Sequence, residues 1–199
     1  MCFYAFQRVF KHYDNKVLSS EDIKAMFGPS ETGIIREHLI HKDKEEAIEL
    51  FYSKYSENHT SLVKVNAEIN NLLQYLKESG IKLGIFTGKA RRSLDISLRH
   101  LQMEGLFEVI ITGDDVIKPK PDSEGLFKAL TLLGVDKNEA LFVGDSDADI
   151  YAGLVAGVQT VGVQWLPDYQ TLEFSYTPDY SMSSISEFMN FIKVGVTNE

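Results

Sequence analysis

Three aspartates at alternating positions directly follow an apolar run. Residues 140–143 predict a short buried strand, and the segment 144–149, which contains Asp145, Asp147 and Asp149, comes immediately after it. Carboxylates spaced this closely repel one another, and the repulsion is tolerable where a hard cation such as Mg2+ lies among them. Because open parallel sheets bind ligands just beyond the carboxyl ends of their strands, this segment is a candidate metal site.

Two other interpretations fit a run of acids. A calcium-binding loop of the EF-hand type is excluded, because its sixth position would be Ile150 instead of glycine and its twelfth Ala156 instead of glutamate. Acids at the start of a helix also stabilise the helix dipole. This simpler interpretation of Asp145 to Asp149 stays open.

A hydroxyl group follows a second predicted strand. Thr87, Gly88 and Lys89 come after the apolar stretch 81–86 and before a predicted helix. A hydroxyl can donate to an anion, glycine allows a close backbone approach, and a helix N-terminus adds positive potential. The segment is therefore a candidate anion site, with an ordinary turn as the alternative.

A lysine follows a third predicted strand, residues 109–111. Lys118 is followed by Pro119, Lys120 and Pro121, and the two prolines restrict the backbone of this loop. A lysine held on such a loop could neutralise a phosphate or a carboxylate. A stiff, solvated loop is the alternative interpretation.

The three candidate segments occur along the chain in the order hydroxyl, lysine, carboxylates. Together they suit a phosphoryl group held beside magnesium, with threonine and lysine at the non-bridging oxygens and the acids at the metal. Receiver domains of response regulators use similar parts, but their acids precede the threonine and lysine. The order in this chain therefore argues against a receiver domain.

The elements that must position these segments change in character near residue 65. Residues 1–60 show apolar residues at helical spacing, such as those at intervals of three and four between Phe3 and Tyr13, and no convincing strand. From residue 66 strands alternate with helices, which predicts a parallel sheet with helices on both faces and so an α/β fold with a Rossmann-like core. The strands are expected at 81–86, 109–111, 140–143, 160–163 and 179–182, and the main helices at 67–78, 90–101, 122–133, 147–156 and 185–192.

Composition narrows the function classes. The 199 residues include 20 Lys and Arg and 29 Asp and Glu, so the net charge is −9, which disfavours a nucleic-acid partner. The sequence contains no apolar run near the ~20 residues of a membrane helix, and we expect no membrane partner. Cys2 is the single cysteine, and the first residues lack the order of a signal peptide. We therefore expect a cytoplasmic protein.

The candidate segments resemble motifs of a known family. Thr87-Gly88, the Lys-Pro-Lys-Pro loop 118–121 and the acidic segment 144–149 are similar to the second, third and fourth motifs of the haloacid dehalogenase (HAD) superfamily. The stretches 83–92 and 149–157 resemble its phosphoglycolate phosphatase and pyrophosphatase branch. The resemblance implies a HAD-like Rossmannoid core over residues 66–199, a helical cap over residues 1–65 that selects the substrate, and magnesium-dependent hydrolysis of a small phosphorylated metabolite.

The resemblance also implies roles for individual residues. Thr87 and Lys118 would act in catalysis by holding the phosphoryl group, and Gly88 would offer a backbone donor. Asp145 would be a magnesium ligand, and Asp149 would support the metal through its waters. Lys89 and Ser30 are further candidates for substrate binding, with a plain interhelix turn as the alternative at Ser30. The expected assembly is a monomer or a homodimer.

The family's first motif, Asp-x-Asp on the first strand, is not found in the sequence. Its first aspartate supplies the nucleophile and its second the general acid and base, and here Asp145-x-Asp147 already belongs to the fourth motif. We therefore expect these 199 residues to be inactive by the family mechanism, either as a short form of an enzyme or as a non-catalytic relative. The non-catalytic alternative would bind phosphate or a partner protein.

Overall fold

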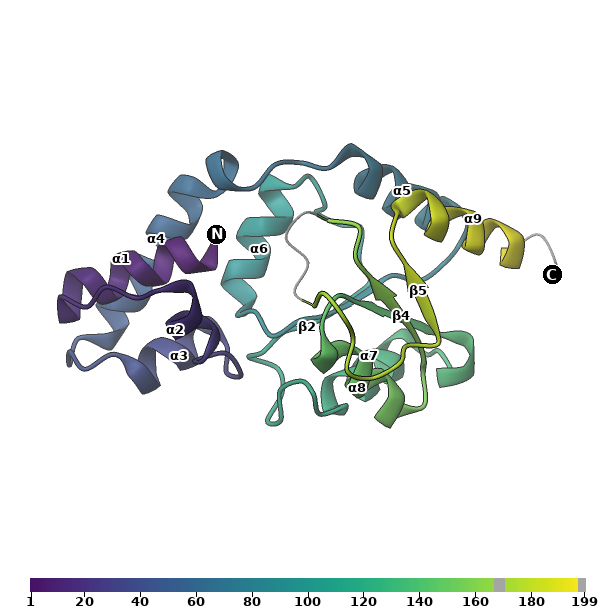
Figure 1. The fold of residues 1–199 in the computed structure, drawn as a ribbon. Coiled ribbons are helices and arrows are strands. Elements are labelled where there is room, and N and C mark those ends of the chain that lie inside the picture. The colour runs from purple at the N-terminus through teal and green to yellow at the C-terminus, as the bar shows by residue number, and fades with distance from the viewer. Residues whose placement is uncertain (167–170, 197–199) are drawn as a thin grey trace. The chain divides into compact units, whose positions relative to one another are not determined.

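The described residues form two compact units. A computed structural model describes residues 1–166 and 171–196 of the chain. The helical unit consists of residues 1–66, 87–105 and 112–115, and the sheet unit consists of 67–86, 106–111 and the described residues from 116 onward. The colour gradient in Figure 1 follows the chain through both units.

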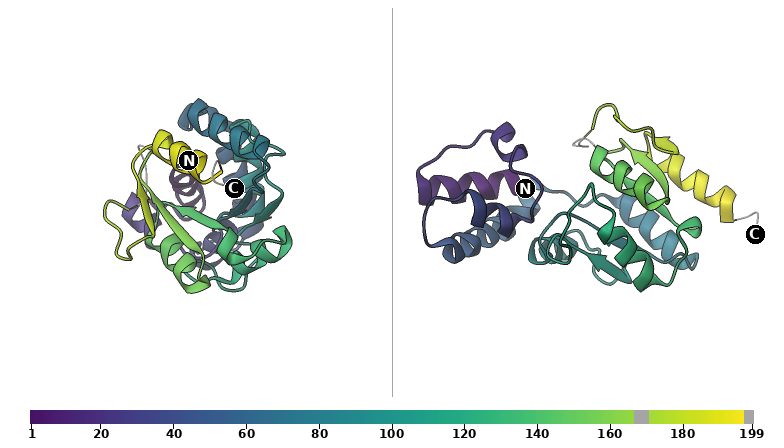
Figure 2. Two further views of the ribbon diagram at one scale, coloured as in Figure 1. Left: turned by 90° about the vertical axis from the view of Figure 1, so that its right-hand side faces the viewer. Right: turned by 90° about the horizontal axis from the view of Figure 1, so that it is seen from below.

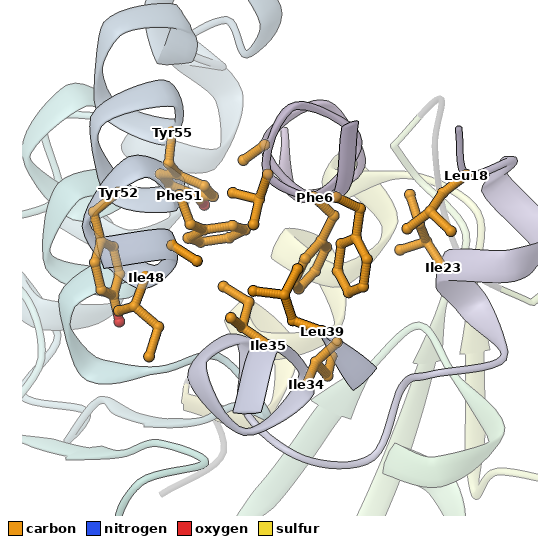
Figure 3. Packing of buried hydrophobic residues seen from close by; sticks show 14 residues of the cluster. Phe6, Leu18, Ile23, Ile34, Ile35, Leu39, Ile48, Phe51, Tyr52 and Tyr55 are labelled. Atoms are coloured by element: carbon orange, nitrogen blue, oxygen red, sulfur yellow. The ribbon is translucent and has the colours of Figure 1, made fainter. Parts of the chain in front are cut away.

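The helical unit contains five helices around one apolar core. The residues buried on α1 include Phe6, Val9 and Phe10, at the three- and four-residue spacing of one helix face, and α1 packs against α4. Phe6 of α1 and Phe51 of α4 meet with ring centroids 4.8 Å apart, and Figure 3 shows this cluster together with Ile35 of α3. The helices are α1 (Cys2–Asp14), α2 (Ser20–Lys24), α3 (Glu31–His38), α4 (Lys44–Leu62) and α6 (Arg91–His100).

The sheet unit alternates helices with short parallel strands. The α/β class predicted from the sequence is confirmed, with strand ends within three residues of the expected positions. The elements are α5 (Ala67–Glu78), β1 (Gly84–Phe86), β2 (Val109–Ile111), α7 (Glu124–Leu133), a 3-10 turn (Lys137–Glu139), β3 (Leu141–Gly144), α8 (Asp147–Ala156), β4 (Gln159–Val163), β5 (Tyr180–Met182) and α9 (Ile185–Val196).

Helices cover both faces of the sheet that contains β3. Successive side chains of a strand point to opposite faces, so Leu141 and Val143 pack into a cluster with Leu72 of α5 and Phe188 of α9, whereas Phe142 packs into the cluster of α7 and α8. Figures 1 and 2 show α5 beside α9 and α7 beside α8. Among the described residues, no helix is both long enough and apolar enough to cross a bilayer.

The strands form two parallel sheets, where the sequence pattern predicts one. β1 pairs with β2 in the register Gly84–Val109, and β3, β4 and β5 pair in that order. Among the described residues, β1 pairs with β2 alone and β3 pairs with β4 alone. The rings of Phe86 and Phe142 stack with centroids 6.2 Å apart, so side chains provide a contact between the two sheets.

Candidate active site

The acidic segment after β3 begins helix α8. Ser146 is its N-cap and accepts the backbone N–H of Asp149, while Oδ2 of Asp149 accepts the backbone N–H and the hydroxyl of Ser146 at 3.2 and 2.6 Å. Asp149 is 6% exposed. The N-cap interpretation of this segment is therefore correct for Ser146 and Asp149, and it leaves Oδ1 of Asp149 for another partner.

Gly144 allows Asp149 to approach the end of β3. A Cβ atom at position 144 would lie 2.3 Å from Cβ of Asp149 and 2.6 Å from its carboxyl carbon. Real Cβ atoms do not come that close to their neighbours, so a residue with a side chain at position 144 would displace Asp149. The glycine before the acids is thus required by packing.

Lys120 supplies the partner of Oδ1 of Asp149. Its ammonium nitrogen lies 2.5 Å from that oxygen and 3.3 Å from the main-chain oxygen of Phe86 at the end of β1. The two charged side chains are 18% and 8% exposed, so this is a nearly buried ion pair. The lysine loop and the acidic segment therefore meet at the carboxyl ends of β1 and β3, through Lys120.

The structure places Lys118, the predicted phosphoryl ligand, in a different environment. Its side chain is exposed, and in the described part of the chain its ammonium group has no hydrogen-bond or ion-pair partner. Lys118 lines an open pocket of about 510 Å³ together with Tyr151 and Val155 of α8. The catalytic role of Lys118 stays a prediction, and Lys120 is the lysine that the sequence interpretation missed.

Glu124 at the start of α7 fixes the lysine loop. Its carboxylate accepts the backbone N–H groups of Ile117 and Lys118, the latter at 2.9 Å, and forms an ion pair with Lys128. The hydrogen bond from Lys128, followed by those from the two N–H groups, lowers the pKa of Glu124 to about 2. The backbone that precedes the two prolines is thus tied to the start of α7.

The remaining acids of the segment also have partners. Asp147 accepts the backbone N–H and the hydroxyl of Ser175 at 2.8 and 2.7 Å, and the main-chain oxygen of Asp145 accepts the N–H of Thr171. The described residues contain no group of three or more histidine, cysteine, aspartate or glutamate residues placed to hold a metal. A carboxylate oxygen is a suitable magnesium donor, so Asp145 fits the metal by its chemistry. Both oxygens of Asp149 are already engaged, which suits its predicted indirect role.

In the helical unit, Thr87, Gly88 and Lys89 form a turn before α6. The hydroxyl of Thr87 accepts the backbone N–H of Lys89 at 3.3 Å, and the main-chain oxygen of Lys89 accepts the N–H of Gly113 at 2.9 Å. A Cβ atom at Gly88 would meet no atom within 4 Å, so its backbone borders open space. The role of this turn as an anion site stays a prediction.

The two other predicted substrate contacts lie in the same unit. Ser30 is the N-cap of α3 and is 9% exposed; a Cβ atom at Gly113 would lie 3.0 Å from Cβ of Ser30 and 2.5 Å from the main-chain oxygen of Gly88. Ser30 and Gly88 therefore both lie next to Gly113, which places Ser30 close to the turn. The ammonium group of Lys89 contacts Glu31 instead of pointing away from the protein.

Comparisons with known proteins show the family of this chain. A family model described as haloacid dehalogenase-like hydrolase matches residues 1–163. The chain belongs to this family. Pyrophosphatase PpaX of Bacillus mycoides (strain KBAB4) is 33% identical over 186 residues, which cover 93% of this chain and 86% of that protein.

Solved structures share the fold of this haloacid dehalogenase-like chain. A predicted phosphoglycolate phosphatase from Haemophilus somnus matches with a TM-score of 0.79 at 19% identity, over 96% of this chain and 90% of its own. CbbY from Rhodobacter sphaeroides, solved in complex with phosphate, matches with a TM-score of 0.78 at 19% identity, over 94% of this chain and 88% of its own. The family assignment predicted from the motifs is confirmed, and the chain is a HAD-like hydrolase of the phosphatase type.

Proposed function

We propose that this chain is a magnesium-dependent phosphatase for a small phosphorylated metabolite. The observation that carries the proposal is the Lys120–Asp149 pair, which joins the lysine loop to the acidic segment where β1 and β3 end. A cation beside acids at strand ends suits a bound phosphoryl group. The relationship to pyrophosphatase PpaX supports phosphate or pyrophosphate esters as the substrate class.

The roles of the residues follow from their chemistry. The Thr87 hydroxyl and the Gly88 N–H would donate to non-bridging phosphoryl oxygens. Of the two loop lysines, Lys118 would neutralise the phosphoryl charge with its exposed ammonium group, whereas Lys120 is paired with Asp149 and would hold the acidic segment in place. Asp145 would hold Mg2+, which when bound would stabilise the charge that develops in phosphoryl transfer. Lys89 and Ser30 would support substrate binding from the helical unit.

We also propose the domain division expected from the sequence, a cap at residues 1–65 and a core at residues 66–199. The helical unit contains all of the first segment, which supports a separate cap. The helical unit also contains α6 and the 87–90 turn. These segments would therefore belong structurally with the cap residues that they contact. A cytoplasmic location and a monomer or homodimer complete the proposal.

Hydrolysis by these 199 residues should be slow. The sequence contains no Asp-x-Asp outside the 145–149 segment, and there Asp147 and Asp149 are engaged with Ser175, Ser146 and Lys120. A group that already accepts hydrogen bonds and an ion pair is a poor nucleophile. We therefore expect turnover far below that of a chain with a free aspartate nucleophile.

The test is an assay of phosphate release from pyrophosphate and a panel of small phosphate monoesters. The chain is compared with Thr87→Val, which removes the hydroxyl at nearly constant volume, each with Mg2+ and with a chelator. Release that requires Mg2+ and falls at least tenfold in Thr87→Val supports the proposal. Equal release by both proteins, or release unaffected by chelation, would overturn it.

A further inference from the structure

A buried polar network runs through the helical unit. Tyr55 on α4 bonds Ser97 on α6 at 2.8 Å, and Ser97 also lies 3.2 Å from Nε2 of His59. At the other end, the hydroxyl of Tyr55 accepts from the ammonium group of Lys89 at 3.0 Å, and that group lies 3.5 Å from Oε1 of Glu31. The network therefore ends at Glu31, the first residue of α3.

The carboxylate of Glu31 faces two donor groups of the same turn. Its Oε1 faces the ammonium group of Lys89, and its Oε2 accepts the backbone N–H of Ala90 at 2.5 Å. Ala90 is the N-cap of α6 and has no side chain that could cap the helix. The carboxylate of Glu31 therefore satisfies the N–H of the N-cap residue from a position 59 residues earlier in the chain, while Oδ2 of Asp114 accepts the N–H of Arg91.

Stability alone is a weak reason for this pair, in which Glu31 is buried and the Lys89 side chain is 33% exposed. The Glu31 side chain is 6% exposed, and buried ion pairs often contribute no more than apolar residues of the same volume. Burial works to lower the pKa of Lys89, but the neighbouring Cys2, Tyr55 and Glu31 outweigh burial and raise it, so Lys89 stays charged. Such a pair fixes one conformation of the segment that carries it.

The segment that this pair fixes is the Thr87–Lys89 turn. The backbone N–H of Lys89 donates to the hydroxyl of Thr87, and the main-chain oxygen of Lys89 accepts from Gly113. Holding both the side chain of Lys89 and the N–H of Ala90 therefore sets the direction of the Thr87 hydroxyl and of the Gly88 backbone. Because Lys89 neutralises Glu31, the carboxylate does not repel an anion at the turn.

We infer that Glu31 is a positioning residue that orients the Thr87–Gly88 turn to receive a phosphoryl group. The inference deepens the proposed function, since it rests on the turn being the anion site. Glutamine at position 31 offers one acceptor oxygen in place of two, so either Lys89 or the N–H of Ala90 would lose its partner. The turn would then move while the rest of the helical core stays in place.

The experiment compares the full chain with three variants. Glu31→Gln removes the charge and one acceptor, and the double variant Glu31→Gln with Lys89→Met removes both charges. Glu49→Gln is the matched control, because Glu49 also pairs with a basic residue near this turn, Arg92, but at the surface. Backbone amide NMR signals of Thr87 and Gly88, the affinity for inorganic phosphate and the melting temperature are measured for each protein.

In Glu31→Gln the Thr87 and Gly88 signals should move and the phosphate affinity should fall at least fivefold, with no such change in Glu49→Gln. In the double variant the melting temperature should recover towards that of the wild type, while the affinity stays low because the Lys89 tether is gone. Recovery of affinity together with melting temperature would show a purely structural role and overturn the inference.

Unchanged signals and affinity in Glu31→Gln would also overturn it. If the wild-type chain binds no phosphate, the proposed anion site fails, and the signals alone then decide the positioning role. Movement beyond that of Glu49→Gln would support the role, and absence of movement would refute it.

Discussion

The ammonium nitrogen of Lys120 lies 2.5 Å from Oδ1 of Asp149, which joins the loop after β2 to the first turn of α8. The neighbouring lysine of the same loop, Lys118, is exposed. Two lysines separated by one proline therefore have different roles, and they provide a matched pair for mutation.

Lys118→Met should weaken phosphate binding at least tenfold, because a charge-assisted contact is lost, and should leave the free energy of unfolding nearly unchanged. Lys120→Met should lower the free energy of unfolding by about 3 kcal/mol, because Asp149 remains nearly buried without its cation. Calorimetric phosphate titration and urea unfolding provide the measurements. A larger effect of Lys120→Met than of Lys118→Met on phosphate affinity would contradict the role predicted for Lys118.

Gly144→Ala should displace Asp149, because the added methyl group would lie 2.3 Å from its Cβ atom. We expect the free energy of unfolding to fall by about 1–3 kcal/mol, as for other overpacked sites. Gly88→Ala is the control, since a Cβ atom there meets nothing within 4 Å. If urea unfolding shows equal stability for Gly144→Ala and the wild type, the close approach of Asp149 to β3 is contradicted.

His59 should make the fold sensitive to mild acid. Burial first, and then the charges of His100 and Lys89, lower its pKa from 6.5 to about 4. Between these two pH values His59 binds a proton in the unfolded chain but not in the folded chain. Stability is therefore fully present above pH 6.5 and decreases as the pH falls towards 4, by at most ~1.4 kcal/mol per pH unit from this group.

Urea unfolding at a series of pH values tests this dependence. His59→Gln should flatten the stability profile between pH 6.5 and 4, whereas His12→Gln, at an exposed residue of α1, should leave the profile unchanged. Identical profiles for His59→Gln and the wild type would show that His59 is not the group responsible.

Magnesium binding to these 199 residues should be weaker than micromolar. Asp149 is engaged by Lys120 and Ser146, and Asp147 by Ser175, so the acidic segment offers few carboxylate oxygens to a cation. Asp145→Asn should abolish the weak binding, and Asp147→Asn should have a smaller effect. Tight, micromolar binding in calorimetry that Asp145→Asn abolishes would contradict an incomplete metal site.

The sequence pattern predicted the order of helices and strands well, because the apolar residues of each amphipathic segment repeat with the period of its helix or strand. The pattern could not separate Lys118 from Lys120, since both lysines precede a proline and have the same local chemistry. The choice depends on which side chain turns towards Asp149, 29 residues beyond Lys120. The contact of Glu31 with the 89–90 turn was missed for the same reason, since Glu31 lies 58 and 59 residues before Lys89 and Ala90 in the sequence.

The stacked rings of Phe86 and Phe142 have a consequence for folding cooperativity. Both rings belong to a cluster with Leu126 and Leu130 of α7, which packs on β1, on β2 and on α8. Hydrogen-bond ladders join strands within each sheet, whereas this apolar cluster connects β1 to β3. We therefore expect the β1–β2 pair and the β3–β5 sheet to unfold together through this cluster and the Lys120–Asp149 pair, and expect loss of the apolar side chains of α7 to weaken that coupling.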